Sequence, residues 1–480
     1  MTIQKINIRP GSKIYLMGIC GTGMAALAGL LHENGYKVVG SDSGCYPPMD
    51  KIINGLQIPL HLGYSPQNIE QEAPDLVIIG NVIRKENPEA KFVLNSEIPY
   101  MSFPQALGEF FLSTKKPLVV TGTHGKTTTS TLLVSALKGL GLEPGFLIGG
   151  VPIDEKQGFK SGKNCDWFVV EGDEYDTSFF QKVSKFLFYK PYGAIITSIE
   201  FDHADIFSDL EEIKRSFKKF VDIIPADGVI AACSDWDSVK EVIKDVKGRV
   251  ITYGFNKEAD WQPKNIKVGS DNTQFIAQGK DGKKIKLCIK LPGRHNVLNV
   301  LSVIALSSGL GLDLEKVAKG LEKCKGVKRR QEVKGEIKGI TIIDDFAHHP
   351  RAVDETLRAL REKYQKRRLI AIFEPRTNTS RRAIFQDYYS EVFGKADLVL
   401  VREVPEAEKF PKDNRFSSKK LVADLNEKGI KAHYFPSAKE IVEFVKKEAK
   451  EGDVYAVFSN GPFENIHKRL IEAIKSQNDI

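Results

Sequence analysis

The chain has 480 residues, of which 41% are hydrophobic and 28% are charged, and its formal net charge is +8. This length favours two or three domains, and the residue balance is that of an ordinary globular protein. No 18-residue apolar run is present and the first residues lack the apolar core of a signal peptide, so we expect a cytoplasmic protein with no membrane partner. Basic residues are interspersed with acidic ones, which favours anionic ligands over nucleic acid.

The cysteines are scattered along the chain and form no CxxC pair. A disulfide framework or a structural zinc site is therefore not expected, and buried free thiols are the simplest interpretation. The six positions are Cys20, Cys45, Cys165, Cys233, Cys288 and Cys324.

The first segment, residues 1–114, is predicted to be a small α/β domain. An apolar strand at residues 14–17 leads into the glycine cluster GICGTG and a helical pattern, and a second strand at residues 36–40 leads to Asp42. Glycines at this place let phosphate approach a helix N-terminus. The spacing is GxxGxG rather than the GxGxxG of dinucleotide enzymes, although Asp42 stands where a ribose-binding acid would. An NAD site, the diphosphate of another nucleotide and a merely structural turn all remain open from this motif.

The second segment, residues 115–325, contains the strongest signal, the loop TGTHGKTTT between a strand at residues 117–120 and a helix. Glycines in such a loop let backbone N–H groups surround phosphate oxygens, Lys126 can reach the β- and γ-phosphates, and Thr127 can offer its hydroxyl to Mg²⁺. Two residues are missing between Gly122 and Gly125 relative to the usual GxxxxGK[ST] spacing. The alternative is a glycine-rich turn with an incidental lysine.

Two more strands of this segment lead to candidate metal ligands, Glu171 after residues 167–170 and His203 after residues 194–198. Carboxylate oxygens suit Mg²⁺, which makes Glu171 the natural ligand. His203 is softer than Mg²⁺ prefers and indicates a second, less selective position, with Mn²⁺ as an alternative ion. Alone, either residue would usually be an ordinary surface or core residue. Residues 250–289 alternate apolar and polar side chains, which predicts antiparallel strands added to the sheet.

The third segment, residues 326–480, alternates strand-like runs with helical stretches, which predicts a parallel, doubly wound sheet. Functional residues should then follow the carboxyl ends of the strands. The polar burst DDFAHHP and the basic stretch FEPRTNTSRR both occupy such places. Arginine forks such as that of Arg376 suit bidentate recognition of carboxylates, and a solvated basic loop is the alternative.

Taken in order, GICGTGM, TGTHGKTTT, EGDEYD, EFDHAD, GRHNVLN, KRRQE and DDFAHHP resemble the motifs of the Mur ligase family of bacterial cell-wall synthesis along essentially the whole chain. The resemblance implies three domains: an N-terminal Rossmann-like domain for a UDP-sugar, a central P-loop-type domain for ATP, and a C-terminal Rossmann-like domain for the amine substrate. The UDP-sugar-binding residues would be Gly18, Gly21, Gly23 and Asp42. The ATP-binding residues would be Gly122, Thr123, His124, Gly125, Lys126, Thr127, Thr128, Asn296, Arg330, Asp345 and His348.

The resemblance also implies an ATP-dependent ligase that forms an amide bond. Lys126, Glu171 and His203 would be catalytic, and Thr127 would join Glu171 and His203 at the metal. Several members of the family use a carbamylated lysine at a second metal, but the matching acidic loop here has no lysine, so none is expected.

Within the family, the stretches EGDEYDTSFF, FEPRTNT and SNGPF are typical of members that join UDP-N-acetylmuramate to the recycled tripeptide L-alanyl-γ-D-glutamyl-meso-diaminopimelate. Arg376 and Asn378 would then contact the peptide. Members that add L-alanine typically show QPHRY where this chain has EPRTN at residues 374–378, and they are the nearer alternative. An NAD-dependent oxidoreductase would leave TGTHGKTTT unexplained, and a non-catalytic nucleotide-binding protein would bind ATP without releasing phosphate.

Overall fold

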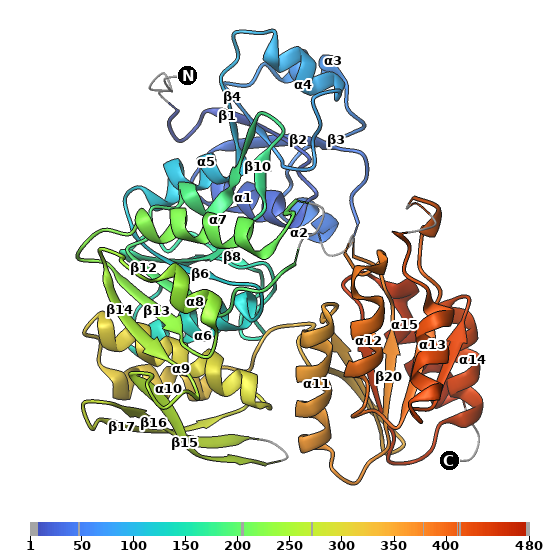
Figure 1. Cartoon of the computed structure of the whole chain (residues 1–480). Helices are drawn as coiled ribbons and strands as arrows, with labels where there is room; N and C mark the ends of the chain where they lie inside the picture. Colours follow the sequence, from blue (N-terminus) through green and yellow to red (C-terminus); the bar gives the residue numbers. More distant parts are fainter. Residues whose placement is uncertain are drawn as a thin grey trace. The chain divides into compact units, whose positions relative to one another are not determined.

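The computed structural model describes residues 8–46, 49–202, 206–269, 272–377, 379–409, 411 and 414–476 (Figure 1). In this part of the chain the strands form sheets of five, ten and six strands and a separate antiparallel pair. Residue contacts divide the chain into two compact units. The first consists of Met1–Phe201, Asp209–Gln262 and Leu301–Leu321, and the second of Asp202–Ser208, Pro263–Val300 and Glu322–Ile480. The α/β class is confirmed, whereas the domain limits at residues 114/115 and 325/326 stay a prediction.

The first sheet lies in the first unit and is entirely parallel, in the order β3-β2-β1-β4-β5. Its central strands β1 and β4 are buried on both faces, which explains their continuous apolar runs. The short strands β3 and β5 were not anticipated from the sequence. The strands are β1 (Lys13–Met17), β2 (Lys37–Asp42), β3 (Leu60–Leu62), β4 (Leu76–Ile79) and β5 (Tyr100–Ser102). The helices are α1 (Thr22–Glu33), α2 (Met49–Gly55), α3 (Pro66–Glu72), α4 (Pro88–Leu94), α5 (Phe103–Leu107) and the π-helical η1 (Gly108–Leu112).

The central sheet has the order β17-β16-β15-β14-β13-β12-β6-β9-β7-β8. The antiparallel strands expected over residues 250–289 are confirmed for β16 and β17 but wrong for β14, which pairs in parallel with both β13 and β15. The helix α8 (Asp237–Val242) provides the crossover between β13 and β14 that a parallel pair needs. The strands are β6 (Lys116–Thr121), β7 (Gly145–Leu147), β8 (Phe159–Lys160), β9 (Trp167–Gly172), β12 (Gly193–Ile196), β13 (Val229–Cys233), β14 (Arg249–Tyr253), β15 (Trp261–Val268), β16 (Thr273–Gly279) and β17 (Lys284–Ile289).

Helices and a small hairpin connect the strands of the central sheet. The hairpin pairs β10 (Asp176–Ser178) with β11 (Gln181–Ser184) and begins at the last residue of the acidic run EGDEYD. The helices are α6 (Lys126–Gly139), the 3₁₀ turn η2 (Lys185–Phe188), α7 (Leu210–Asp222), α8 (Asp237–Val242), α9 (Arg294–Gly309) and α10 (Leu314–Lys323).

The third sheet lies in the second unit and has the order β18-β19-β23-β20-β21-β22. All its pairings are parallel except that of the edge strand β18, so the doubly wound sheet expected here is confirmed. The strands are β18 (Glu332–Ile337), β19 (Ile340–Asp345), β20 (Leu369–Phe373), β21 (Leu398–Arg402), β22 (Ala432–Phe435) and β23 (Val454–Phe458). The helices are α11 (Pro350–Lys363), η3 (Ala383–Phe385), α12 (Gln386–Val392), η4 (Ala407–Lys409), α13 (Ser418–Glu427), α14 (Ala438–Glu448), η6 (Phe463–Asn465) and α15 (Ile466–Lys475).

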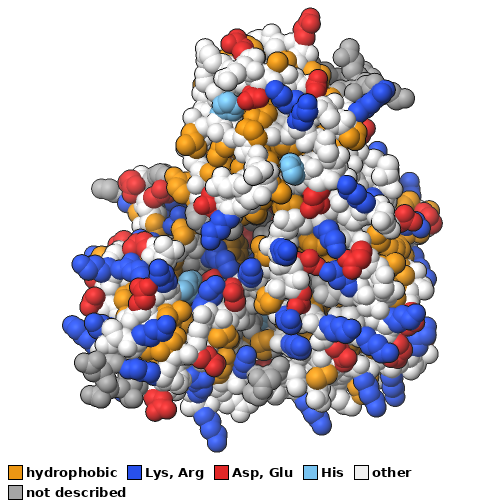
Figure 2. Space-filling model, turned by 180° about the vertical axis from the view of Figure 1, so that it is seen from behind, with side chains coloured by type: hydrophobic (Ala, Val, Ile, Leu, Met, Phe, Trp, Pro, Cys, Tyr) orange, Lys and Arg blue, Asp and Glu red, His pale blue; other side chains and the backbone are white. Residues whose placement is uncertain are grey.

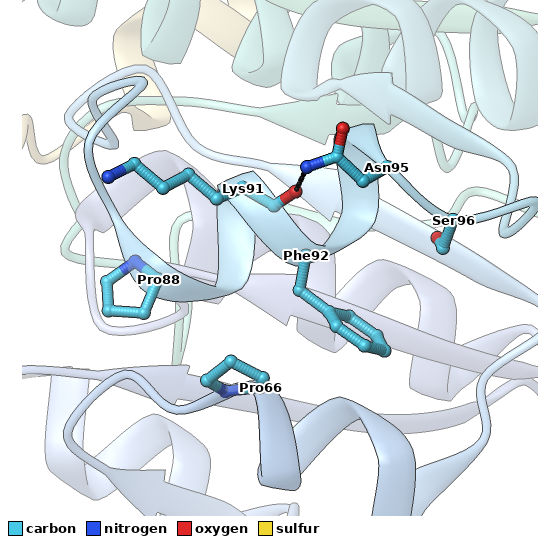
Figure 3. Close-up of a pocket in the computed structure, with 6 residues that line it drawn as sticks. All are labelled: Pro66, Pro88, Lys91, Phe92, Asn95 and Ser96. Carbon is cyan, nitrogen blue, oxygen red and sulfur yellow. Dashed lines mark hydrogen bonds between the residues drawn. The ribbon is translucent and has the colours of Figure 1, made fainter.

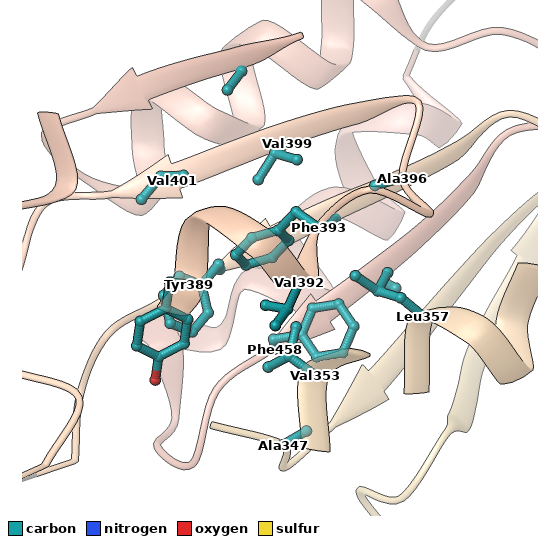
Figure 4. Close-up of a cluster of buried hydrophobic side chains, with 14 of the residues drawn as sticks. Ala347, Val353, Leu357, Tyr389, Val392, Phe393, Ala396, Val399, Val401 and Phe458 are labelled. Carbon is teal, nitrogen blue, oxygen red and sulfur yellow. The ribbon is translucent and has the colours of Figure 1, made fainter. Parts of the chain in front are cut away.

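An apolar cluster on one face of the third sheet fixes the strand ends that carry polar residues (Figure 4). Phe373, at the end of β20, is fully buried and packs against Tyr389 and Phe393 with ring centroids 4.9 and 5.6 Å apart. Burying each such aromatic side chain stabilises the fold by about 1.5–3 kcal/mol. The carboxyl end of β20 is therefore a rigid platform for the residues that follow it.

The surface matches the interspersed charges of the sequence. On the face drawn in Figure 2, Lys and Arg side chains are spread out with Asp and Glu side chains between them. Among the helices that the structure describes, none is long and apolar enough to cross a membrane.

Candidate functional site

The glycine cluster of the first unit folds against the end of β2. The N–H groups of Gly18 and Ile19 donate to the carbonyl oxygen of Ser41 at 2.8 and 3.1 Å. The N–H of Cys20 donates to the Asp42 carboxylate at 2.9 Å. Gly21 is the N-cap of α1, and the first turn of α1 follows it. The structure thus brings the four predicted UDP-sugar residues together at the carboxyl ends of β1 and β2, where a helix N-terminus can receive phosphate.

A disulfide joins this glycine cluster to the segment after β2, and here the expectation of free thiols was wrong. Cys20 and Cys45 are bonded across a Cα–Cα distance of 5.3 Å, although they are 25 residues apart in sequence. The two parallel strands β1 and β2 are neighbours, so the residues that follow them meet even without a CxxC motif. The other cysteines, Cys165, Cys233, Cys288 and Cys324, are free as expected.

Replacing Cys45 by serine is expected to lower the free energy of unfolding by about 3 kcal/mol in the absence of reductant, because the disulfide closes a 25-residue loop in the unfolded chain. Thermal unfolding with and without dithiothreitol tests this: wild type and C45S should differ only without the reductant. C288S alters a free cysteine and should match wild type in both conditions. Equal unfolding temperatures of wild type and C45S without reductant would contradict the bond.

A buried carboxylate, which sequence reasoning missed, supports the end of β2. Glu89 is fully buried and accepts hydrogen bonds from the hydroxyls of Tyr15 (2.9 Å) and Ser41 (2.5 Å) and from the Asn68 amide (2.8 Å). Burial raises the pKa of Tyr15 well above its usual value, so its phenol stays a donor at any working pH. These hydrogen bonds connect α4 to β1 and β2. They hold Ser41 in place, and the carbonyl oxygen of Ser41 accepts the hydrogen bonds from the glycine cluster.

The loop TGTHGKTTT lies between β6 and α6, the strand and helix that its sequence predicts on either side of it. Gly122 has φ +126°, and a Cβ there would lie 2.2 Å from the Thr197 hydroxyl, so only glycine fits. The N–H groups of Thr123 and His124 donate to the Ser198 carbonyl (2.9 Å) and hydroxyl (3.1 Å). The loop therefore rests on the residues after β12, a support that sequence reasoning did not find.

A second partner from the same region orients His124. Its Nε2 lies 2.7 Å from a carboxylate oxygen of Glu200. The N–H of Glu200 in turn donates to the Thr123 hydroxyl at 2.9 Å. Glu200 belongs to the stretch EFDHAD after β12. The polar residues that follow the neighbouring strands β6 and β12 are therefore hydrogen-bonded to one another.

Lys126, at the start of α6, points back over the loop toward an acid that was not predicted. Its Nζ donates to the Gly122 carbonyl at 2.7 Å and to Glu174 Oε2 at 3.1 Å. Burial disfavours the ammonium form, but Glu174 and Asp173 outweigh burial and raise the pKa of Lys126. Glu174 is 3% exposed, so this carboxylate is bound to the lysine in a water-poor setting. The sequence feature that could have indicated Glu174 is its position in EGDEYD, three residues after Glu171.

Thr127 and Glu171 converge as two of the predicted metal ligands. The Thr127 hydroxyl donates to Glu171 Oε2 at 3.2 Å, and the other carboxylate oxygen accepts from the N–H of Gly149 at 2.7 Å. A hydroxyl and a carboxylate oxygen at this spacing form a donor set that fits Mg²⁺. His203 lies outside the described residues. Within the described residues no group of three or more His, Cys, Asp or Glu is arranged to hold a metal.

The other predicted ATP-binding residues lie in the second unit, around the end of β19. Asp345 is 3% exposed and accepts from the N–H groups of Gln331 (2.8 Å) and Ala347 (2.7 Å). The guanidinium of Arg330 stacks over the Phe346 ring, 4.9 Å from its centroid. His348 Nδ1 lies 3.1 Å from the Phe346 carbonyl. Arg330, Asp345 and His348 are thus brought together as predicted.

Asn296, at the start of α9, belongs to the same unit. Its amide donates to the Pro292 carbonyl at 2.6 Å, and its oxygen accepts from Asn299 at 3.1 Å. Its neighbour His295 lies 3.4 Å from the Gln331 amide, which places the start of α9 beside the segment that carries Arg330.

The buried position of Asp345 predicts a pH dependence of stability. Burial raises the pKa of this carboxyl to about 6, against a smaller opposing effect of Arg330. The folded chain then binds a proton more tightly than the unfolded chain between about pH 4 and pH 6. This residue's contribution to stability is therefore full at low pH and falls as pH rises through that window, by up to roughly 3 kcal/mol.

The variant D345N removes this titration. Relative to D345N, wild type should lose stability between about pH 4 and pH 6 in denaturant unfolding, and the stability difference between the two proteins should stay constant above pH 6. A difference that does not change with pH would contradict a raised pKa at this residue.

Arg376, predicted to contact the peptide, follows β20 and is partly exposed, with Nη1 3.8 Å from the buried carboxylate of Glu374. Its predicted companion Asn378 lies outside the described residues. A pocket of about 440 Å³ opens elsewhere, beside α3 and α4, and Figure 3 shows the side chains that line it. None of the predicted site residues lines this pocket. Its lining is mainly apolar because of Phe92 and the two prolines, so the pocket does not support binding of the charged substrates expected here.

Comparisons with known proteins account for nearly the whole chain. Models of the Mur ligase family match in three consecutive parts: the catalytic domain at residues 13–114, the middle domain at residues 120–307 and the glutamate ligase domain at residues 329–461. The chain is 37% identical, over 96% of its length and 98% of the relative's, to the UDP-N-acetylmuramate–L-alanyl-γ-D-glutamyl-meso-2,6-diaminoheptandioate ligase of Escherichia coli K12.

Two crystal structures are similar over almost their full length. A murein peptide ligase from Psychrobacter arcticus is 33% identical with a TM-score of 0.74, covering 98% of this chain and 100% of the other. The UDP-N-acetylmuramate–alanine ligase of Thermotoga maritima is 25% identical with a TM-score of 0.81, covering 97% and 99%. Backbone similarity thus does not separate the two kinds of enzyme, whereas identity is higher to the peptide ligase. The chain belongs to the Mur ligase family and is an ATP-dependent ligase that forms amide bonds.

Proposed function

We propose that this enzyme joins the lactyl carboxylate of UDP-N-acetylmuramate to the amine of L-alanyl-γ-D-glutamyl-meso-diaminopimelate, in peptidoglycan recycling. The observation that carries the proposal is the similarity to the Escherichia coli tripeptide ligase, which extends over 96% of this chain. The stretch EPRTN at residues 374–378 supports the same acceptor, since alanine-adding members typically show QPHRY at this place.

The first step is attack of the sugar carboxylate on the γ-phosphate of ATP, which gives an acyl phosphate and ADP. Gly18, Gly21, Gly23 and Asp42 would hold the UDP-sugar. The loop at residues 122–128 would surround the ATP phosphates with N–H groups, and Lys126 would neutralise charge on the transferred group. This lysine is already charged and directed over its loop, so little reorganisation is needed.

A metal ion would be held by Thr127 and Glu171, with His203 as a further ligand. Mg²⁺, or Mn²⁺ in its place, would supply charge neutralisation between the phosphates when bound. Asn296, Arg330, Asp345 and His348 would be the further nucleotide-binding residues.

The second step is attack of the peptide's α-amine on the acyl phosphate. A tetrahedral intermediate forms, phosphate leaves, and the amine proton passes to solvent. A free α-amine has a pKa of roughly 7.7–8.0, so a useful neutral fraction exists without a strong base. Catalysis is then mainly positioning and charge neutralisation.

Phosphate release from ATP tests the acceptor. With Mg²⁺ and UDP-N-acetylmuramate present, we expect release with the tripeptide and only background release with L-alanine. Omission of UDP-N-acetylmuramate should abolish release with either acceptor. Release with alanine alone would overturn the tripeptide proposal and leave an alanine-adding member of the same family, while binding of ATP without release under every condition would favour a non-catalytic protein.

A further inference from the structure

The carboxyl edge of the third sheet carries a buried ion pair beside Arg376. Glu374 directly follows β20 and is fully buried. One carboxylate oxygen accepts from the Arg402 guanidinium at the end of β21, and the other accepts from the Ser459 hydroxyl directly after β23. Both oxygens of Glu374 are therefore occupied by partners from the neighbouring strands, so the buried charge is paired and held in place.

Arg376 lies next to this ion pair but forms no hydrogen bond with it. Its Nη1 is 3.8 Å from Glu374 Oε1, which is too long for a hydrogen bond. Its side chain is 39% exposed, and this approach to Glu374 is its one polar contact with the described residues. The guanidinium thus keeps its hydrogen-bond donors available at the edge of a parallel sheet, where α/β proteins bind their ligands.

Gly461 holds the arginine in this position. A Cβ on Gly461 would lie 2.3 Å from both Cδ and Nε of Arg376, so the stem of the arginine lies directly on the bare Cα. The backbone of Gly461 cannot retreat: its N–H donates to the Ser459 hydroxyl at 3.0 Å, and its carbonyl accepts from Arg329 at 2.9 Å. Any side chain at residue 461 must therefore displace Arg376.

We propose that Gly461 is a specificity-determining position, because it presents Arg376 as the receptor for a carboxylate of the acceptor peptide. The inference rests on the proposed function, since the tripeptide carries carboxylates on its glutamyl and diaminopimelyl residues that L-alanine cannot place there. A planar guanidinium fork binds a carboxylate through two parallel hydrogen bonds. Arg402 cannot take this role because its fork is committed to Glu374 and Glu464.

The test is steady-state kinetics with the tripeptide as the varied substrate. R376A should raise the KM for the tripeptide by roughly 10- to 100-fold, the loss expected for hydrogen bonds between charged groups. G461A should raise it by roughly tenfold, with kcat and the KM values for ATP and UDP-N-acetylmuramate nearly unchanged. The matched control is G394A, because nothing lies within 4 Å of a Cβ at Gly394 and its φ is not positive.

The double variant R376A/G461A separates this role from a general structural one. If residue 461 acts through Arg376, the double variant is no worse than R376A alone. Additive losses, or an equal loss in kcat and in the KM for ATP, would overturn the proposal.

Acceptors with single carboxylates converted to amides give a second, independent readout. Wild type should lose affinity for the tripeptide in which the recognised carboxylate is an amide, and R376A should no longer distinguish that analogue from the parent. A wild-type enzyme that does not use the tripeptide would overturn both this inference and the proposed function. Use of the tripeptide with an unchanged KM in both R376A and G461A would overturn this inference alone.

Discussion

Replacement of Lys126 by alanine is expected to lower the rate of ATP-dependent ligation on the order of 10²–10³, the cost of losing one preorganised charge in an active site. UDP-sugar binding should stay largely intact, because the glycine cluster and Asp42 belong to a different sheet. The rate is measured as phosphate release at saturating ATP, and binding by calorimetry with UDP-N-acetylmuramate alone. K126A retaining most of its turnover would contradict the role of this lysine.

The pairing of Lys126 with Glu174 determines how that experiment is designed. K126A alone leaves a carboxylate that is 3% exposed without its cation, which typically costs 3–5 kcal/mol of stability. The variant K126A/E174Q removes the charge from both partners and should recover stability but not turnover. K185A is the matched control, since Lys185 pairs with Asp173 of the same acidic run at 2.9 Å and has no proposed role in catalysis.

Replacement of Glu171 by glutamine should lower turnover on the order of 10²–10³ at a fixed Mg²⁺ concentration and shift half-saturation to higher Mg²⁺. The amide keeps the shape of the side chain and an oxygen that can accept from Gly149, so the effect should come from the missing charge. A Mg²⁺ titration of phosphate release measures both quantities.

D176N is the control for Glu171, because Asp176 belongs to the same acidic run but is not a proposed ligand. It should titrate with Mg²⁺ as wild type does. Identical Mg²⁺ curves for wild type and E171Q would remove Glu171 from the metal site and leave the phosphate loop itself unaffected.

The parts of the site that follow buried parallel strands could be predicted from the sequence. Strands such as β6, β9 and β20 are buried on both faces, so they appear as continuous apolar runs, and the polar residues directly after them stand out. In the register of β6 with β9, Val120 pairs with Glu171, which brings the phosphate loop and the acidic run together. Lys126, Thr127, Glu171 and Asp345 were singled out in the sequence for this reason, and their roles stay a prediction.

The partners of these residues could not be predicted, because they depend on which strands become neighbours. Glu374 meets Arg402 and Ser459 only because β20 lies between β21 and β23, and β23 comes from much later in the chain. The Cys20–Cys45 bond likewise requires that β1 and β2 be adjacent. Short edge strands such as β3 were missed because three residues carry too little of an apolar pattern.

A competition reaction tests the central claim most directly. Equal concentrations of L-alanine and the tripeptide are offered together with ATP, Mg²⁺ and limiting UDP-N-acetylmuramate, and the UDP-linked products are separated by mass. The account predicts that the product carrying the tripeptide predominates and that its amount matches the phosphate released. A product carrying alanine alone would contradict it.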